Sequence, residues 1–104
     1  MDKIFKVATM SEFEMMIASK DFSISQCIVE TVLKNLNTKR KRLHAFSVEC
    51  LDRGVTLDIT METKYFVQTL QENLKHYIRE ERYEDCIEIE KAIAYLKEKG
   101  GYLC

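Results

Sequence analysis

Residues 65–97, YFVQTLQENLKHYIREERYEDCIEIEKAIAYLK, decide the expected fold of this chain. Apolar residues recur there every three or four positions, which is the spacing of one helix face, in two separate runs. The first run is Phe66, Leu70, Leu74, Tyr77 and Ile78, and the second is Cys86, Ile89, Ile93 and Leu96. A charged segment, residues 79–82, interrupts both runs. The pattern predicts two amphipathic helices folded back on one another within residues 61–98.

The composition is typical of one globular domain over residues 1–104, with 46% apolar and 32% charged residues. Lys and Arg number 16 against 17 for Asp and Glu, so the net charge of -1 gives no global attraction to nucleic acid or membrane. No apolar run has the length of a membrane span, and the first residues do not have the pattern of a signal peptide. We therefore expect a cytoplasmic domain that does not associate with membranes.

The four cysteines are Cys27, Cys50, Cys86 and Cys104. They are far apart in the sequence and form no CxxC pair, which predicts reduced thiols in a cytosol and not a disulfide framework. We expect the first three in the core and the last one exposed.

The N-terminal third is expected to be mainly helical. Residues 3–8 predict a short strand or a frayed terminus, and two helices follow within residues 12–36. Two pairs have capping-box spacing: Ser11 with Glu14, and Ser23 with Gln26. The first helix is expected to end near Lys20 and the second near Asn37.

Residues 43–59 have the alternation of a β-hairpin. The alternating apolar residues are Phe46, Val48 and Cys50 before the turn, and Val55, Leu57 and Ile59 after it. Asp52-Arg53-Gly54 supplies the turn residues. The competing interpretation is one helix over residues 39–52, because the apolar residues of that segment also fit a helical stripe. We favour the hairpin, since β-branched residues and Thr dominate its second half.

The expected fold class is α+β: two N-terminal helices, a β-hairpin and a C-terminal antiparallel helical hairpin. An all-α bundle is the alternative. Thr60 is expected to cap the first helix of the C-terminal hairpin, which would begin at Met61 or Glu62.

The C-terminal hairpin resembles the UVR motif, a short helical hairpin found in the B and C subunits of the bacterial excision nuclease and in some protease-chaperone regulators. The matching positions are Tyr83-Glu84 for the aromatic-acidic pair, Cys86 and Ile87 for the small or apolar residues, and Ile93 and Leu96 for later apolar positions. Glu90 stands where the family has an arginine. The resemblance implies contact with another protein, hairpin against hairpin.

The run E-x-Y-E-x-C-x-x-I over residues 81–89 is also similar to runs in uncharacterised small proteins of large tailed bacteriophages. This similarity implies a viral origin, with a host enzyme or a defence protein as the partner.

The predicted function is that of a non-enzymatic, protein-binding adaptor or inhibitor that acts through the C-terminal hairpin. The expected interface has Tyr77, Tyr83 and Ile87 at its centre and Arg79, Glu80, Arg82 and Glu84 around them. A homodimer through the same hairpin is a second arrangement. The competing interpretation is a plain hairpin that closes the core of its own domain.

The alternative function is nucleic-acid or nucleotide binding through a basic loop at residues 34–42. Its positive residues are Lys34, Lys39, Arg40, Lys41 and Arg42. No acidic residue occurs from Thr31 to Val48, and such a cluster can contact phosphates. The competing interpretation is a solvated loop, because the segment has no interleaved aromatic residues and the chain as a whole is close to neutral.

No catalytic, metal-binding or cofactor-binding motif stands out in the sequence. His44 and His76 have no Cys or second His at ligand spacing, and the three glycines form no phosphate-binding loop. We therefore expect a protein that is not an enzyme and needs no cofactor.

Overall fold

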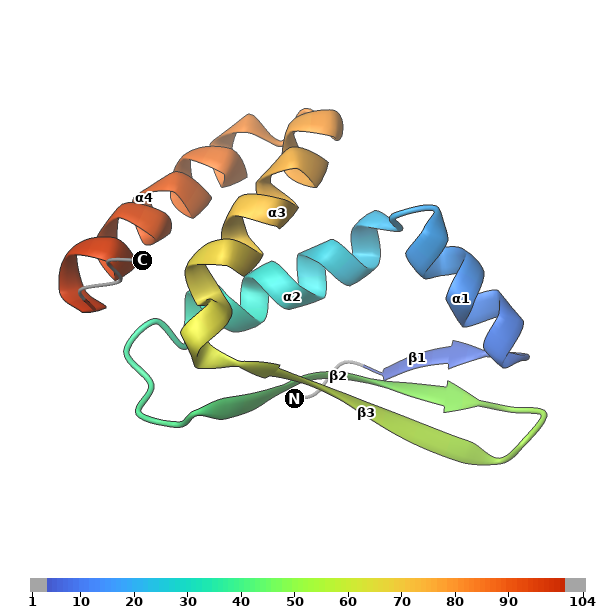
Figure 1. Ribbon diagram of the computed structural model, residues 1–104. Coiled ribbons are helices and arrows are strands. Elements are labelled where there is room, and N and C mark those ends of the chain that lie inside the picture. The colour runs from blue at the N-terminus through green and yellow to red at the C-terminus, as the bar shows by residue number, and fades with distance from the viewer. Residues whose placement is uncertain (1–3, 101–104) are drawn as a thin grey trace.

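The computed structural model describes residues 4–100 and shows an α+β fold with its helices on one side of a three-stranded sheet (Figure 1). The elements are β1 (Ile4–Val7), α1 (Met10–Ala18), α2 (Phe22–Lys34), β2 (Arg42–Cys50), β3 (Val55–Glu62), the 3-10 turn η1 (Thr63–Tyr65), α3 (Phe66–Arg79) and α4 (Tyr83–Gly100). The predicted fold class is confirmed. The all-α alternative and the single helix over residues 39–52 are wrong, because β2 occupies most of that segment.

The strands have the order β1-β2-β3, with β2 at the centre of the sheet. β1 pairs in parallel with β2, with Ile4 opposite Ser47, and this confirms the predicted N-terminal strand. β3 pairs antiparallel with β2 through the predicted turn, where Gly54 has a φ of +63° that favours glycine. A register shift between His44 and Phe46 marks a β-bulge in β2.

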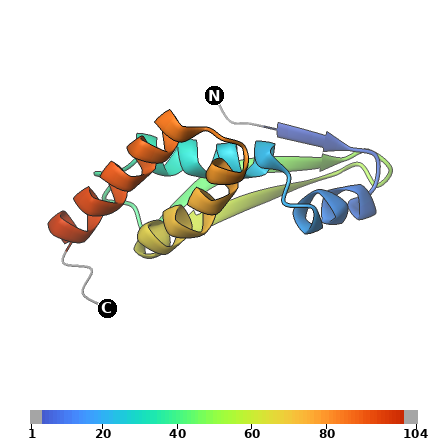
Figure 2. The same ribbon diagram turned by 90° about the horizontal axis from the view of Figure 1, so that it is seen from above.

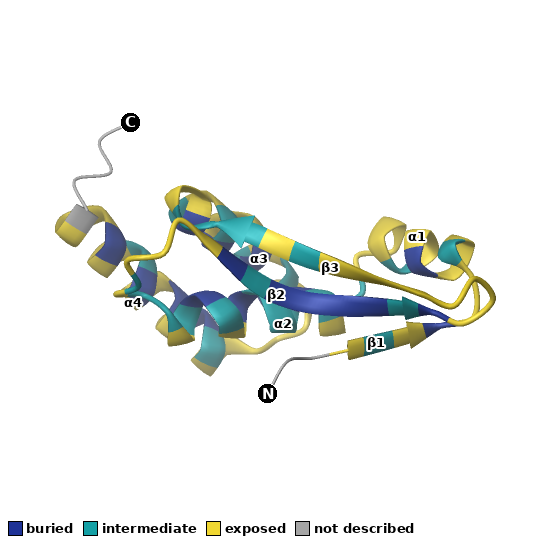
Figure 3. Cartoon of the chain, turned by 90° about the horizontal axis from the view of Figure 1, so that it is seen from below, coloured by how far each residue is buried: buried dark blue, intermediate teal, exposed yellow. Residues whose placement is uncertain are grey.

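The two faces of the sheet differ in polarity, because successive side chains of a strand point to opposite faces. The apolar residues of β2 and β3 on the inner face include Phe46, Val48, Cys50, Ile59 and Met61. The outer face carries polar residues in register: His44, Ser47, Glu49, Thr56, Asp58 and Thr60. No helix of residues 4–100 covers the outer face (Figure 3).

α1 and α2 begin before the predicted capping residues, because other side chains cap them. Thr9 is the N-cap of α1, and its Oγ1 accepts the backbone N–H of Glu12 at 3.2 Å. Asp21 is the N-cap of α2, and its Oδ1 accepts the backbone N–H of Ser23 at 2.8 Å. The predicted capping boxes that start at Ser11 and Ser23 are therefore wrong, since both serines lie within the helices.

Two other predicted helix boundaries are wrong. α2 ends at Lys34 and not near Asn37. Residues 60–62 still pair with β2, so Thr60 belongs to a strand and caps no helix. The chain then turns through η1 and enters α3 at Phe66 without a side-chain cap. Of the helices within residues 4–100, none combines the length and the apolar character needed to cross a membrane.

Two buried clusters lie between the helices and the sheet. The helical core consists of Val29, Val32, Leu43, Phe66, Leu70, Tyr77, Cys86, Ile89, Ala92 and Leu96. The sheet core consists of Val7, Phe13, Ala45, Phe46, Val48 and Cys50. α2 contributes to both, with Ile24 and Ile28 packed against the sheet core, and Met61 packs against both cores. The two cores are therefore continuous.

The cysteines within residues 4–100 form no disulfide. Cys50 and Cys86 are buried, which confirms their predicted core positions, and Cys27 is half-buried against the sheet core. Burial raises the pKa of the Cys86 thiol, with Glu90 and Asp85 adding to the effect. The predicted exposure of Cys104 lies outside the described residues.

Candidate functional site

The α3–α4 hairpin packs on α2 by one face, as seen from the side in Figure 1 and from above in Figure 2. In α3, Ser25 Oγ of α2 donates to Asn73 Oδ1 at 2.6 Å and contacts His76 Nδ1. In α4, the buried residues Ile89, Ala92 and Leu96 share the helical core with Val29 and Val32 of α2. These contacts identify the side of each helix that faces α2. We call the opposite side of the hairpin its outer face.

Three large apolar side chains are exposed on the outer face. Ile78, Tyr83 and Ile87 have exposed fractions of 50%, 59% and 52%. At about 100° per residue, Ile78 lies roughly opposite the α2-facing side of α3. Tyr83 and Ile87 are one turn apart and lie roughly opposite the α2-facing side of α4. We call these three residues the apolar outer patch.

The charged bend of the hairpin is tied to the turn between α1 and α2. Arg79 Nη2 donates to the carbonyl oxygen of Lys20 at 2.9 Å. Arg79 Nε also lies 3.3 Å from Glu80 Oε2. Both partners of this ion pair are exposed, so solvent screens it, and its main effect is to order the side chains beside the patch.

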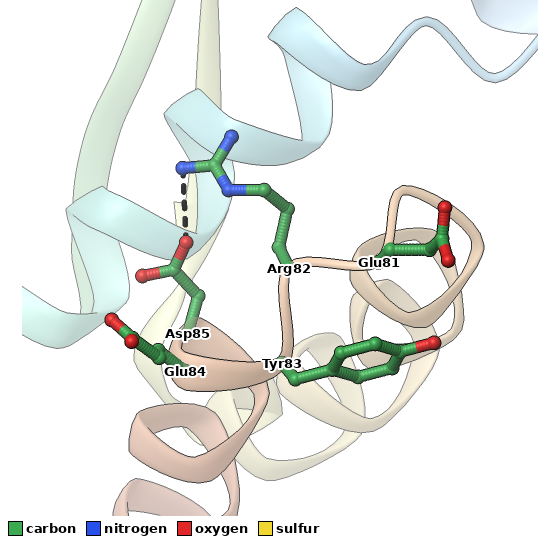
Figure 4. A pocket seen from close by; sticks show the side chains of 5 residues that line it. All are labelled: Glu81, Arg82, Tyr83, Glu84 and Asp85. Atoms are coloured by element: carbon green, nitrogen blue, oxygen red, sulfur yellow. Dashed lines mark ion pairs between the residues drawn. The ribbon is translucent and has the colours of Figure 1, made fainter.

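Arg82 ties the start of α4 to α2. Its Nη2 lies 2.9 Å from Asp85 Oδ2, and its guanidinium carbon lies 5.4 Å from the centroid of the Phe22 ring. Figure 4 shows Arg82 and Asp85 directed toward α2, whereas Tyr83 points away from it. Glu84 is exposed beside them. The bend therefore fixes how the hairpin presents the apolar outer patch.

Tyr77 was expected at the centre of the interface, but the structure places it in the helical core. Its exposed fraction is 3%, and its ring packs edge-on against Phe22 with the centroids 4.8 Å apart. Burial raises the pKa of its hydroxyl to about 12, with Glu30 as the next contributor. The physical reason is position, because Tyr77 lies one turn after Asn73 on the core-facing stripe of α3. The other six predicted partner-binding residues are exposed around the bend.

The bend also carries a shallow hollow of about 560 Å³, shown in Figure 4. Its lining is one continuous segment, residues 81–85, and four of these five side chains are charged. Small-molecule sites are concave, mostly apolar and lined by several elements. This hollow is better suited to lie within a larger protein contact.

The basic loop lies at the other end of the hairpin from the bend, where α2 ends and β2 begins (Figure 1). Its exposed positive residues are Lys34, Lys39, Arg40, Lys41 and Arg42. Arg42 Nη2 lies 3.6 Å from Glu62 Oε1, which neutralises the carboxylate next to the loop. The structure therefore separates the two surfaces that the sequence singled out.

His44 lies on the outer face of the sheet beside a serine and an aspartate. Its Nε2 is 2.8 Å from Ser47 Oγ, and that hydroxyl donates to Asp58 Oδ1 at 2.7 Å. In a Ser-His-Asp triad the histidine stands between the other two residues, whereas here the serine does. His44 Nε2 also lies 3.6 Å from Asp58 Oδ1, so the three side chains form a polar network across β2 and β3 without the order of a catalytic triad.

His76 belongs to the contact between α2 and α3. Burial lowers its pKa, and the positive charges of Arg79, Lys20 and Lys75 lower it further. The ring is therefore neutral near pH 7, and it shares Ser25 Oγ with Asn73. Within residues 4–100, no group of three or more His, Cys, Asp or Glu side chains is arranged to hold a metal ion.

Sequence reasoning missed two features of these surfaces. Ile78 was assigned to the core stripe although it is half-exposed. It directly follows Tyr77, and consecutive residues of a helix point in different directions, so the sequence could have indicated that the two are not equally buried. Nothing in the sequence indicated that the elements carrying Tyr65 and Tyr95 would contact the basic loop. Tyr95 and Asn37 are hydrogen-bonded although 58 positions separate them in the sequence.

No protein-family model, curated protein or solved structure matches this chain. The resemblance of the C-terminal hairpin to the UVR motif stays a prediction.

Proposed function

We propose that this chain is a non-enzymatic adaptor or inhibitor whose protein partner docks on the outer face of the α3–α4 hairpin. The observation that carries the proposal is the apolar outer patch. Three large apolar side chains, each at least half exposed, lie on the same side of a helical hairpin whose other side is packed against α2. Single exposed apolar residues are ordinary, whereas a group of them on one face is typical of an interface.

The surroundings of the patch suit a specific contact. Arg79, Glu80, Arg82 and Glu84 form a rim of mixed charge around the bend. Such a rim adds little affinity but selects against partners whose charges do not match. The contacts of Arg79 and Arg82 with the α1–α2 segment hold the bend in place before binding, which reduces the entropy that a partner must remove.

The resemblance to UVR hairpins supports a protein as the partner, with one hairpin packed on another. The similarity of residues 81–89 to phage proteins supports a host enzyme or defence protein as the target. The cysteines of residues 4–100 are not joined in disulfides, which supports a cytoplasmic setting.

A pull-down from lysate of the source cells tests the proposal. The tagged chain is compared with Tyr83→Ala and Ile87→Asp, and both variants are expected to lose the captured partner because they remove or charge the centre of the patch. Met15→Ala is the matched control, since Met15 is 71% exposed on α1, away from the hairpin. This control is expected to retain the partner.

Light scattering of the same four proteins distinguishes a foreign partner from a second copy. A dimer that both patch variants convert to monomer would make this chain its own partner. Retention of the partner by Tyr83→Ala and Ile87→Asp, with both variants folded, would show that the outer face is not the binding surface.

A further inference from the structure

We propose that the basic end of the molecule is a second binding site, for single-stranded nucleic acid. The site combines the exposed cations of residues 39–42 with two half-exposed tyrosines, Tyr65 of η1 and Tyr95 of α4, whose elements are hydrogen-bonded to the loop. This inference does not depend on the outer face of the hairpin.

η1 holds one flank of the basic loop. Thr63 Oγ1 donates to the carbonyl oxygens of Arg40 and Lys41, at 2.9 Å and 3.3 Å. The backbone N–H of Thr63 also donates to the carbonyl oxygen of Lys41 at 2.9 Å. The loop backbone is thereby fixed on the segment that carries Lys64 and Tyr65.

The last turns of α4 hold the other flank. Tyr95 Oη donates to Asn37 Oδ1 at 2.5 Å, and Lys99 Nζ donates to the carbonyl oxygen of Leu36 at 2.8 Å. Both acceptors lie just before the basic residues in the chain. The basic loop is therefore held between η1 and α4.

Each flank presents an aromatic ring with a lysine over it. Tyr65 is 46% exposed and Tyr95 is 41% exposed. Lys64 Nζ lies 5.1 Å from the centroid of the Tyr65 ring, and Lys99 Nζ lies 5.8 Å from that of Tyr95. The loop sequence has no interleaved aromatic residues, and the fold supplies them from elements distant in sequence.

This combination matches the chemistry of a single strand better than that of a duplex or an acidic protein. Exposed bases stack on aromatic rings while the phosphates between them contact Lys and Arg. Such a site needs no helix or strand that enters a groove of duplex DNA. A duplex hides its base faces, and an acidic peptide has no ring to stack. Either DNA or RNA offers the required chemistry.

The site lies far enough from the apolar outer patch for both to be occupied together. Sixteen residues separate Tyr83 from Lys99 along α4, which corresponds to about 24 Å at about 1.5 Å per residue. A protein that uses both surfaces would bring its protein partner to a nucleic acid.

Fluorescence anisotropy tests the proposal with labelled oligothymidylate and oligouridylate of about twelve nucleotides, a duplex of the same length and an oligoglutamate peptide. The intact chain is expected to bind at least one single strand about 10-fold more tightly than the duplex or the peptide. Comparison of the two single strands identifies DNA or RNA as the ligand. Equal or tighter binding of the duplex or of the peptide would overturn the proposal, as would the absence of binding to both single strands.

Variants then separate the two components of the site. Lys39→Gln, Arg40→Gln and Lys41→Gln together are expected to weaken binding and to reduce the slope of log K against log salt by about 2. Lys75→Gln with Lys91→Gln, which removes two charges from the hairpin, is the charge control, and it is expected to leave that slope almost unchanged. An unchanged slope in the three-Gln variant would overturn the role of the loop.

The rings are tested by Tyr65→Leu with Tyr95→Leu, which is expected to weaken single-strand binding about 10-fold without changing the salt slope. Tyr65→Phe with Tyr95→Phe is the matched control, because it keeps both rings and removes only the hydroxyl groups. If the Phe pair binds as weakly as the Leu pair, or the Leu pair binds like the intact chain, stacking is excluded. Tyr83→Ala is expected to bind nucleic acid normally, so the two proposals can fail separately.

Discussion

The helical core and the sheet core are enclosed in different ways. The helical core lies among α2, α3 and α4, with Leu43 of β2 at its base. The sheet core is covered by α1 and α2 on one face of the sheet only, while the other face is open (Figure 3). We call the part of the molecule around each core the helical half and the sheet half. In the sheet half, large apolar side chains are exposed on α1, on β3 and in the β2–β3 turn: Met15, Ile17, Leu51, Val55 and Leu57.

The two cores are therefore expected to differ in their resistance to local unfolding. The enclosed core contains fully buried Leu70 and Ile89 and the polar contact of Ser25 with Asn73. The sheet core has fewer buried residues and is covered on one face of the sheet only, so we expect its elements to open more readily. Both proposed binding surfaces lie on the elements that enclose the helical core, which is the better place for preorganised contacts.

The strongest test of the comparison removes one large side chain from each core. Phe66→Ala and Phe46→Ala are each expected to lower the free energy of unfolding by about 3–5 kcal/mol. Urea unfolding is followed by circular dichroism, which reports the whole chain, and by tyrosine fluorescence. Within residues 4–100 all tyrosines lie in η1, α3 and α4.

Because Met61 packs against both cores, we expect both probes to shift together in both variants. A Phe46→Ala variant whose tyrosine transition stays in place would show that the two cores unfold independently.

A second test concerns the polar contact inside the helical half. Ser25→Ala leaves Asn73 Oδ1 without the hydroxyl donor, and we expect a loss of about 1–3 kcal/mol because a buried acceptor becomes unsatisfied. Ser23→Ala on the exposed side of α2 is the control, expected to stay within about 0.5 kcal/mol of the intact chain. Equal stabilities of the two variants would show that the Ser25–Asn73 contact does not stabilise the helical half.

A third test concerns the cap of α1 at the edge of the sheet half. Thr9→Ala is expected to cost about 1 kcal/mol, because it removes the side-chain acceptor of the Glu12 N–H and leaves only the Thr9 carbonyl oxygen, at 3.2 Å. Ser11→Ala is the control, since Ser11 lies within the helix and alanine favours helix. Hydrogen exchange of the α1 amides should rise in the first variant only, and the reverse order would restore Ser11 as the cap.

The smallest expected effect is a pH dependence confined to the helical half. Because the pKa of His76 is lower in the folded chain than its ordinary value near 6.5, the unfolded chain binds more protons as the pH falls. Its contribution to stability is therefore complete above about pH 6.5 and decreases as the pH falls through the lowered pKa. Urea unfolding of the intact chain and of His76→Gln, each between about pH 7.5 and 5.5, isolates this contribution. A difference between the two proteins that grows in favour of the intact chain at lower pH would contradict the assignment.

Local patterns predicted most of the secondary structure of this chain and less of its boundaries. The alternation around Asp52-Arg53-Gly54 correctly predicted the β2–β3 hairpin, because pleating and turn chemistry act over a few residues. The capping residues were misassigned at Ser11 and Ser23 because Thr9 and Asp21, which can also cap, lie two positions earlier and start the helices there. Thr60 was misassigned because pairing with β2 extends β3 beyond the apolar alternation.

The sequence predicted where the two candidate surfaces lie, but not all of the residues that form them. Helical periodicity located the bend and its charges, yet it could not distinguish the buried Tyr77 from the exposed Tyr83, since that depends on where α2 packs. The charge run located the basic loop. The contacts of η1, which contains Tyr65, and of α4, which contains Tyr95, with the loop could not be predicted, because they join residues far apart in the chain.

The sequence by itself determined the kinds of elements and their order, because hydrophobic periodicity and turn residues act between near neighbours in the chain. The tertiary structure alone decided the parallel pairing of β1 with β2, the open face of the sheet and the side of the helical hairpin that remains exposed. These features depend on contacts between residues far apart in the chain. Such contacts form only when the whole set of apolar faces is buried together.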